Sequence, residues 1–266
     1  MSITYYLVQF SPLLLFIGIT IGVGMLAAFA AFLFRKYVNI KILRSHNEVT
    51  GFLFLAIASL YSLLLGFVVL IVWDQLNETR NNVSKEGSTA LSLYHDIKSY
   101  PDSTAIKPVL SAYLNFVFLV VDDEFPNMQL LKKSRKTPEA FNEVFVRMEQ
   151  LNPQTPVQVQ LVAEMFHNLN ELASLRGLRT TAIETEIPPP IWLPIIFGAI
   201  ITLLCSFFLD IEHQRLHITL IFLLGAFIGM FWFVIINLDH PFSGAYALKP
   251  QFYYELFTLE KWDHQN

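Results

Sequence analysis

Residues 49–94 constrain the fold of this chain most strongly. The part from 51 to 73 holds no charged side chain in 23 residues, and about 20 apolar residues at about 1.5 Å each cross a bilayer core. The sequence then turns polar, yet the next glycine is Gly87 and the next proline is Pro101. No helix-stop signal marks the membrane surface. We therefore predict a transmembrane helix that continues into a soluble helical domain.

Composition supports a membrane protein. Hydrophobic residues make up 54% of the chain and charged residues 15%, against roughly 45–50% and 25% in soluble domains. The net charge of −4 offers no basic field, so we expect no nucleic-acid partner. The single cysteine, Cys205, falls in a hydrophobic stretch, which excludes an intrachain disulfide and a thiolate zinc site.

Four hydrophobic stretches predict an all-α integral membrane protein with four spans, at residues 7–34, 51–73, 192–209 and 216–238. The loop 35–50 holds Arg35, Lys36, Lys41 and Arg44 against one acid, and the positive-inside rule places it in the cytoplasm. Both termini and residues 74–187 then lie on the outer side of the membrane. We expect this membrane to be a bacterial inner membrane. The expected parts are 1–73 with two spans, 74–187 as an extramembrane domain, 188–238 as a transmembrane hairpin, and 239–266 as an aromatic tail.

Residues 74–187 predict an antiparallel helical bundle. A helix buried on most sides begins after Asp102 and ends at the acidic run before Pro126. Thr137 is expected to cap a helix reaching about residue 151, and Thr155 a longer helix over about 157–183, each with proline in the first turn.

Small and polar residues recur every three or four positions along the second span, so they share one helix face. They are Ser59, Ser62, Gly66, Val69 and Trp73, and the row continues through Asn77 and Arg80. Such a stripe indicates close helix packing, because small residues let helices approach. It also fits a water-lined path, and the sequence leaves both interpretations open.

Two further patterns predict local structure. The G-x-x-x-G pairs Gly18/Gly22 and Gly225/Gly229 are typical of closely packed membrane helices, although Gly22-Val23-Gly24 also suits a flexible point. Residues 239–244 predict a structural corner, where Pro241 ends the last span, Phe242 docks the tail and Gly244 permits an unusual backbone turn.

Catalytic motifs are absent from the sequence, so we predict neither an enzyme nor a cofactor. His213 and His217 are spaced as metal ligands can be, but they lack a third ligand, and we interpret them as an interfacial polar pair. Asp122, Asp123 and Glu124 could bind Ca²⁺ or line a cation vestibule. The interpretation that we favour is salt bridges to the basic residues 132–136 or to Arg176 and Arg179.

Several motifs together resemble the bestrophin-like domain family of unknown function. They are Leu65-Gly66-Phe67-Val68-Val69 with Trp73, Glu86 and Ala90, residues 123–128, residues 176–179, Pro190-Ile191-Trp192, and residues 238–244. Phe125 departs from the tryptophan of most relatives. The resemblance implies a distant relation to bestrophins, pentameric anion channels with a Leu-Gly-Phe-Tyr-Val segment in the pore helix, where this chain has Val68 for the tyrosine.

Two functional hypotheses follow. In the first, four or five copies form an ion channel whose pore is lined by Ser59, Ser62, Gly66, Val69 and Trp73 and constricted by Leu55, Phe67 or Val69. Its outer mouth would carry Asn77, Arg80, Asp122, Asp123 and Glu124. Its partners would be ions, membrane lipid and further copies of the chain. In the second, the chain is a membrane-anchored sensor or scaffold whose helical bundle binds a partner.

Overall fold

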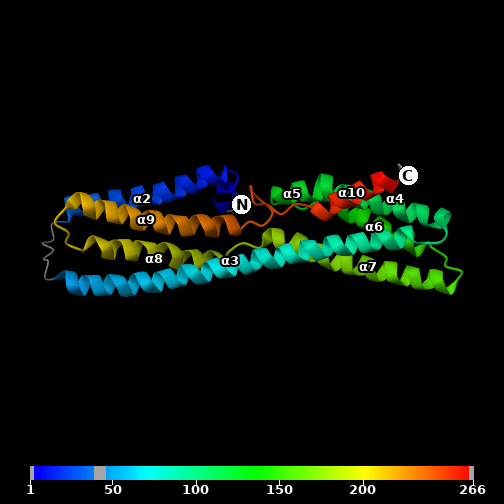
Figure 1. Ribbon diagram of the computed structural model, residues 1–266, viewed down its shortest axis with the longest axis horizontal. Helices are drawn as coiled ribbons and strands as arrows, with labels where there is room; N and C mark the ends of the chain where they lie inside the picture. The colour runs from blue at the N-terminus through cyan, green and yellow to red at the C-terminus, as the bar shows by residue number, and fades with distance from the viewer. Residues whose placement is uncertain (1–2, 39–45, 264–266) are drawn as a thin grey trace. The chain divides into compact units, whose positions relative to one another are not determined.

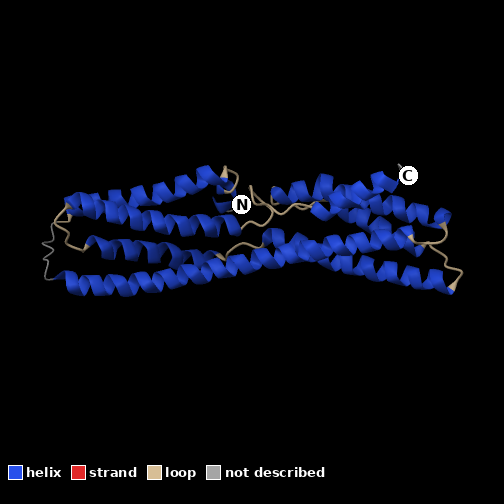
Figure 2. Cartoon of the chain, viewed as in Figure 1, coloured by secondary structure: helices blue, strands red, loops and turns tan. Residues whose placement is uncertain are grey.

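The computed structural model describes residues 3–38 and 46–263, and these form helices joined by loops (Figures 1 and 2). The chain divides into two compact units. The membrane unit comprises Ser2–Gln75 and Glu186–His240, and the bundle unit comprises Leu76–Thr185 and Pro241–Asn266. Arg44 and Lys41, on which the predicted orientation partly rests, lie outside the described residues.

Helix α3, Asn47–Lys98, belongs to both units and confirms the uninterrupted helix predicted from the sequence. Its 52 residues contain no proline, and the chain leaves the helix just before Pro101. His95 and Lys98 occupy the last turn, where positive charge favours the helix dipole. The membrane-crossing sequence and the polar sequence are therefore one element.

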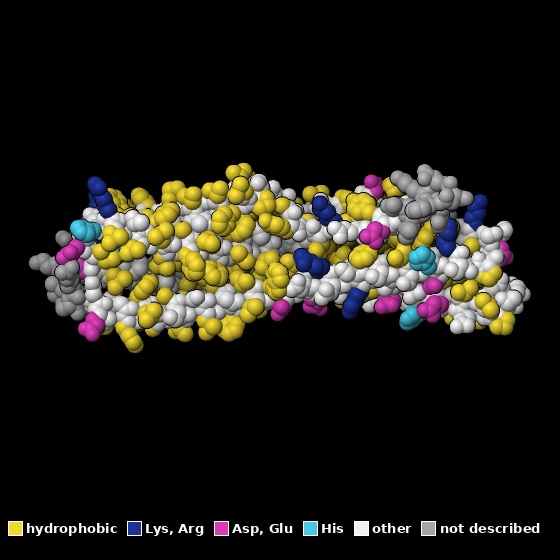
Figure 3. Space-filling model, viewed as in Figure 1, with side chains coloured by type: hydrophobic (Ala, Val, Ile, Leu, Met, Phe, Trp, Pro, Cys, Tyr) yellow, Lys and Arg dark blue, Asp and Glu magenta, His cyan; other side chains and the backbone are white. Residues whose placement is uncertain are grey.

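Four further helices complete the membrane unit: α1 Ile3–Leu7, α2 Pro12–Tyr37, α8 Pro189–Phe207 and α9 Gln214–Leu238. The first span begins at Pro12 rather than at residue 7, because Ser11-Pro12 starts a new helix after the short α1. On the face shown in Figure 3, hydrophobic side chains cover the part of the surface that these helices form. Lipid is the solvent suited to such a surface.

Helices α2 and α9 pack at glycine contacts. A Cβ at Gly225 would lie 3.0 Å from the Val23 carbonyl oxygen, and one at Gly229 would lie 2.9 Å from that of Ile19. The predicted packing role of this pair is confirmed. Gly18 and Gly22 have no described atom within 4 Å of such a Cβ, so no helix of the described chain packs closely at that pair, and its packing role stays a prediction.

The bundle unit joins the second part of α3 to α4 Ser103–Leu119, the π-helix η2 Val120–Glu124, α5 Phe125–Gln129, α6 Lys136–Glu149, α7 Pro156–Thr181, the short 3₁₀ helix η3 Ala182–Glu184 and α10 Gln251–Asp263. Its core consists of fully buried side chains such as Leu93, Tyr113, Phe116, Val144 and Leu169. Helix α4 supplies several of them from one face. Lys107, Ser111, Asn115 and Phe118 are exposed, so the prediction that this helix is buried on most sides is wrong.

Two predicted helix boundaries are wrong. The acidic run does not end its helix: it forms η2, and Pro126 stands in the first turn of α5, where its missing N–H costs nothing. Thr137 is no cap, since α6 begins at Lys136, and Ser134 Oγ instead accepts the Thr137 N–H at 3.1 Å. Thr155 does cap α7, reciprocally with Gln158.

Within residues 3–38 and 46–263, five helical segments are long and apolar enough to cross a membrane, one more than the sequence predicted. Four are α2, α3, α8 and α9, and the fifth is Ser103–Gln129 in the bundle unit. The fifth segment carries Tyr113, Phe116, Val117 and Val120, all fully buried in the bundle core. Part of the hydrophobicity of this segment is therefore accounted for by contacts in the bundle core.

The predicted corner, residues 239–244, follows α9, and its part from Pro241 onward belongs to the bundle unit. Phe242 is buried and meets the Phe125 ring edge-on at 6.2 Å between centroids, and the Ser243 hydroxyl donates to the Gln129 carbonyl at 3.0 Å. Gly244 has a φ of 78°, a conformation that side chains with a Cβ disfavour. The expected backbone role of Gly244 is confirmed.

Asp239, just after α9, makes stability depend on pH. Its buried carboxylate accepts the Ile187 N–H at 2.7 Å, yet burial raises the pKa of Asp239 from 3.8 to about 6. The folded protein then binds a proton that the unfolded chain releases above about pH 4, so this group lowers stability as pH rises from 4 to 6. Over the whole titration of Asp239, the contribution of this group to the free energy of unfolding falls by about 3 kcal/mol.

We expect Asp239→Asn to gain stability relative to the wild type as pH rises from 4 to 7, measured by chemical unfolding in detergent. Comparing variant with wild type cancels the opposite effect of His240, whose pKa burial lowers and which therefore destabilises the fold on acidification below about pH 6.5. A stability difference that stays constant over this range would contradict the assignment.

Candidate functional site

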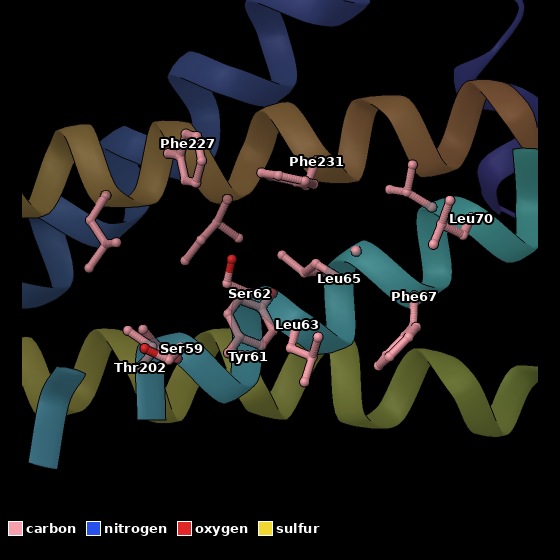
Figure 4. Close-up of a pocket in the computed structure, with 15 residues that line it drawn as sticks. Ser59, Tyr61, Ser62, Leu63, Leu65, Phe67, Leu70, Thr202, Phe227 and Phe231 are labelled. Atoms are coloured by element: carbon pink, nitrogen blue, oxygen red, sulfur yellow. The ribbon is translucent and has the colours of Figure 1, made fainter. Parts of the chain in front are cut away.

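The predicted stripe of α3 borders a cavity of about 910 Å³ within the membrane unit (Figure 4). One wall is the part of α3 from Ala58 to Leu70. Thr202 of α8 and residues 224–231 of α9 supply the opposite walls. Most of the lining is apolar, and hydroxyl groups from Ser59, Ser62 and Thr202 interrupt it.

Tyr61 fixes how α3 faces this cavity. Its hydroxyl donates to the Ile195 carbonyl at 3.0 Å and accepts from Trp232 Nε1 at 3.4 Å, which ties α3 to α8 and α9. The ring lies where Gly198 has no side chain, because a Cβ there would be 2.5 Å from Tyr61 Cδ2. Leu65, one turn along, is buried on the same side. The stripe is thereby turned toward the cavity.

Four of the five predicted pore residues, Ser59, Ser62, Gly66 and Val69, line the cavity. Trp73 is not among the lining residues and is 47% exposed. The Ser59 hydroxyl donates to the Leu55 carbonyl of its own helix at 2.7 Å. The Ser62 oxygen points from α3 toward α9 (Figure 4). Ser62 therefore offers the cavity a hydroxyl.

Apolar side chains form the rest of the lining. Phe67 and Val69, two of the three suggested constricting residues, belong to it, whereas Leu55 does not. Sequence reasoning missed the opposing residues of α9, Phe227 and Phe231. Helix α9 is apolar on all sides, so no periodic signal separates its cavity-facing side chains from those facing lipid.

The predicted mouth residues are dispersed in the bundle unit. Asn77 is half-buried and Arg80 is exposed on α3. Asp122 is exposed on η2, while Asp123 accepts a hydrogen bond from the Ser134 hydroxyl. Arg80 and Glu124 line two different cavities. The described residues contain no group of three His, Cys, Asp or Glu side chains placed to hold a metal ion.

Glu124 belongs to a buried ion-pair cluster, the interpretation favoured from the sequence for the acidic run. Arg179 of α7 lies between two carboxylates: its Nε donates to Glu86 Oε2 at 2.6 Å, and an Nη to Glu124 Oε2 at 2.7 Å. Arg176 also donates to Glu124, at 3.2 Å through Nε. The Tyr253 hydroxyl donates to Glu86 at 2.7 Å. The pairing of Glu86 with Arg179, 93 residues apart, had no signal in the sequence.

The cluster is electrically balanced, with two carboxylates and two guanidinium groups. Arg179 and Glu86 are each 0% exposed. Burial alone would lower the pKa of Arg179, but Glu86 and Glu124 outweigh it and hold that pKa above its usual range. The cation also lies 4.7 Å from the centre of the Phe125 ring. These contacts join α3, η2, α7 and α10 in the bundle core, which is a structural role.

The fold and this site define an all-helical integral membrane protein with a hydroxyl-bearing cavity among its spans. The Bestrophin-like domain family matches residues 21–253, which is most of the chain. The protein therefore belongs to the Bestrophin-like domain family.

Solved structures share the fold. A variant of a bacterial bestrophin homologue from Klebsiella pneumoniae matches with a TM-score of 0.63 and 14% identity, over 94% of this chain and 99% of that one. A second variant of such a homologue has a TM-score of 0.60 and 15% identity, over 94% and 100%. The crystal structure of a membrane protein variant has a TM-score of 0.63 and 14% identity, over 93% and 96%. No curated protein matches.

Proposed function

We propose that the protein is a homo-oligomeric ion channel whose pore is lined by the membrane part of α3. The observation that carries the proposal is the cavity beside α3, with Ser62 directed into it. Membership in the Bestrophin-like domain family supports a channel, since bestrophins are anion channels. Asn77 and Arg80 follow on the same helix face and are proposed for the mouth.

Several copies are needed to close such a pore. The membrane unit has no charged residue in the membrane part of α3 between 51 and 73, so a single subunit offers no ion relay. Leu63 and Phe67 border the cavity and are each 56% exposed. In a symmetric ring of four or five subunits, the same face of each α3 would surround the axis.

Charge at position 62 tests this proposal. We expect the purified protein to conduct ions in planar bilayers, with Ser62→Asp favouring cations and Ser62→Lys favouring anions. One charge per subunit, repeated around a narrow pore, changes the permeability ratio about tenfold or more. Leu64→Ala, on another face of α3, is the control and should leave selectivity unchanged.

Two outcomes would contradict the channel. One is silent bilayers from well-folded oligomers, and the other is a reversal potential indifferent to both Ser62 substitutions. Either would favour the second hypothesis, in which the membrane unit is an anchor and the bundle unit binds a partner.

The proposed arrangement in the membrane has four spans, α2, α3, α8 and α9, with the bundle unit and both termini outside. The charges Arg35 and Lys36 at the end of α2 support this orientation. In a Cys205→Ala background, Ser99→Cys should be labelled by an impermeant thiol reagent on intact cells and His213→Cys should not. Labelling of the second variant alone would reverse the orientation.

A further inference from the structure

A second cavity, in the bundle unit, has the chemistry of an anion site. Its volume is about 460 Å³, and it lies between α3 and the segment that leads from the Gly244 corner into α10. Arg80 and Lys249 both line it, and none of its ten lining residues is acidic. Two positive charges at one concave site attract an anion.

The lining includes both polar and apolar side chains. Ser84 and Gln251 add a hydroxyl and an amide beside the two cations. The buried side chain of Val83 and the half-buried Phe252 supply an apolar surface. The ligand expected from this lining has a charged group and a small organic part.

We propose that this cavity binds a phosphate group esterified to a small organic moiety of the glycerol phosphate type. A phosphate carries about 1.5 to 2 negative charges near neutral pH and three acceptor oxygens, which matches two cations with a neighbouring hydroxyl and amide. Arginine presents a planar fork suited to phosphate oxygens, and lysine binds phosphate as a point charge. A halide ion would leave most of the 460 Å³ unfilled.

The phosphoester group has two sources. One is a soluble monoester, and the other is the diester headgroup of an anionic phospholipid, which carries one negative charge and two free oxygens. The test uses the full-length protein in phosphatidylcholine nanodiscs and titrates sn-glycerol 3-phosphate by calorimetry. A second set of nanodiscs contains phosphatidylglycerol. Weakened binding of the soluble probe there identifies the lipid headgroup as the occupant, and unchanged binding identifies a soluble phosphoester.

Substitutions locate the site. We expect Arg80→Gln and Lys249→Gln each to weaken sn-glycerol 3-phosphate binding by about tenfold, the loss of one charge-assisted hydrogen bond. Lys85→Gln removes an exposed cation from α3 outside the cavity and should stay within about twofold of the wild type. Arg80→Lys keeps the positive charge but lacks the planar guanidinium group. Its affinity for sn-glycerol 3-phosphate should lie between those of the wild type and Arg80→Gln.

Three results would overturn the proposal: no saturable binding in either nanodisc, equal weakening by Lys85→Gln, or displacement of the probe by an equal concentration of chloride. These experiments measure binding and not ionic current. A negative result would therefore rule out the phosphoester site without contradicting the channel, and bilayers without current would contradict the channel without ruling out the site.

Discussion

Replacement of Arg179 by methionine is expected to destabilise the protein by about 3–5 kcal/mol, because it leaves a buried carboxylate without its cation. Glu86 is fully buried and receives both an Nε and an Nη hydrogen bond from Arg179. After the substitution, the Tyr253 hydroxyl would be the one donor to Glu86 that remains among the described residues. The loss should appear as a lower midpoint of chemical unfolding in detergent.

Two further variants distinguish the effect on stability of burying a charge from the effect of pairing it. Glu143→Gln breaks an ion pair with Arg147 whose side chains are 46% and 43% exposed, and it should cost no more than about 0.5 kcal/mol. The double variant Glu86→Leu/Arg179→Met removes both charges and should recover part of the loss. If Arg179→Met alone stayed within about 1 kcal/mol of the wild type, the cluster would not stabilise the bundle as argued.

Substitution of Gly87 by alanine is expected to displace α10 from α3. A Cβ at Gly87 would lie 2.5 Å from Phe252 Cγ, so Phe252 must move. Overpacking of this kind costs about 1–3 kcal/mol, and the cost should fall on the contact between these two helices. Hydrogen exchange should accelerate in α10 while α7 stays protected.

A matched glycine and a compensating change control this experiment. A Cβ at Gly177 of α7 would have no described atom within 4 Å, so Gly177→Ala should stabilise by about 0.5–1 kcal/mol through helix propensity. Adding Phe252→Ala to Gly87→Ala should restore room and slow exchange in α10 relative to the single variant. Unchanged exchange in Gly87→Ala would mean that α10 does not depend on this contact.

The membrane character of the chain and its long helix were readable from the sequence for a local reason. Uncharged runs of bilayer length and the lack of a breaker between Gly66 and Gly87 are properties of neighbouring residues. The Thr155 cap and the Gly244 turn are local in the same sense. The failed Thr137 cap shows the limit, because Ser134 satisfies the same helix end from three residues earlier.

In the candidate site, too, the local features were readable from the sequence and the long-range contacts were not. Helical spacing alone placed Ser59, Ser62 and Gly66 on one face of α3. Which way that face turns depends on Tyr61, whose partners Ile195 and Trp232 are 134 and 171 residues away.

What the sequence by itself determined is the set of elements and the residues sharing a helix face, since these follow from the helical period and from local stop signals. Only the tertiary structure decided which faces meet. In the tertiary structure, Glu86 pairs with Arg179 and Phe252 packs against Gly87. Arg80 and Lys249 line the same cavity. Those contacts join distant segments through shape and charge complementarity, which no pattern within either segment encodes.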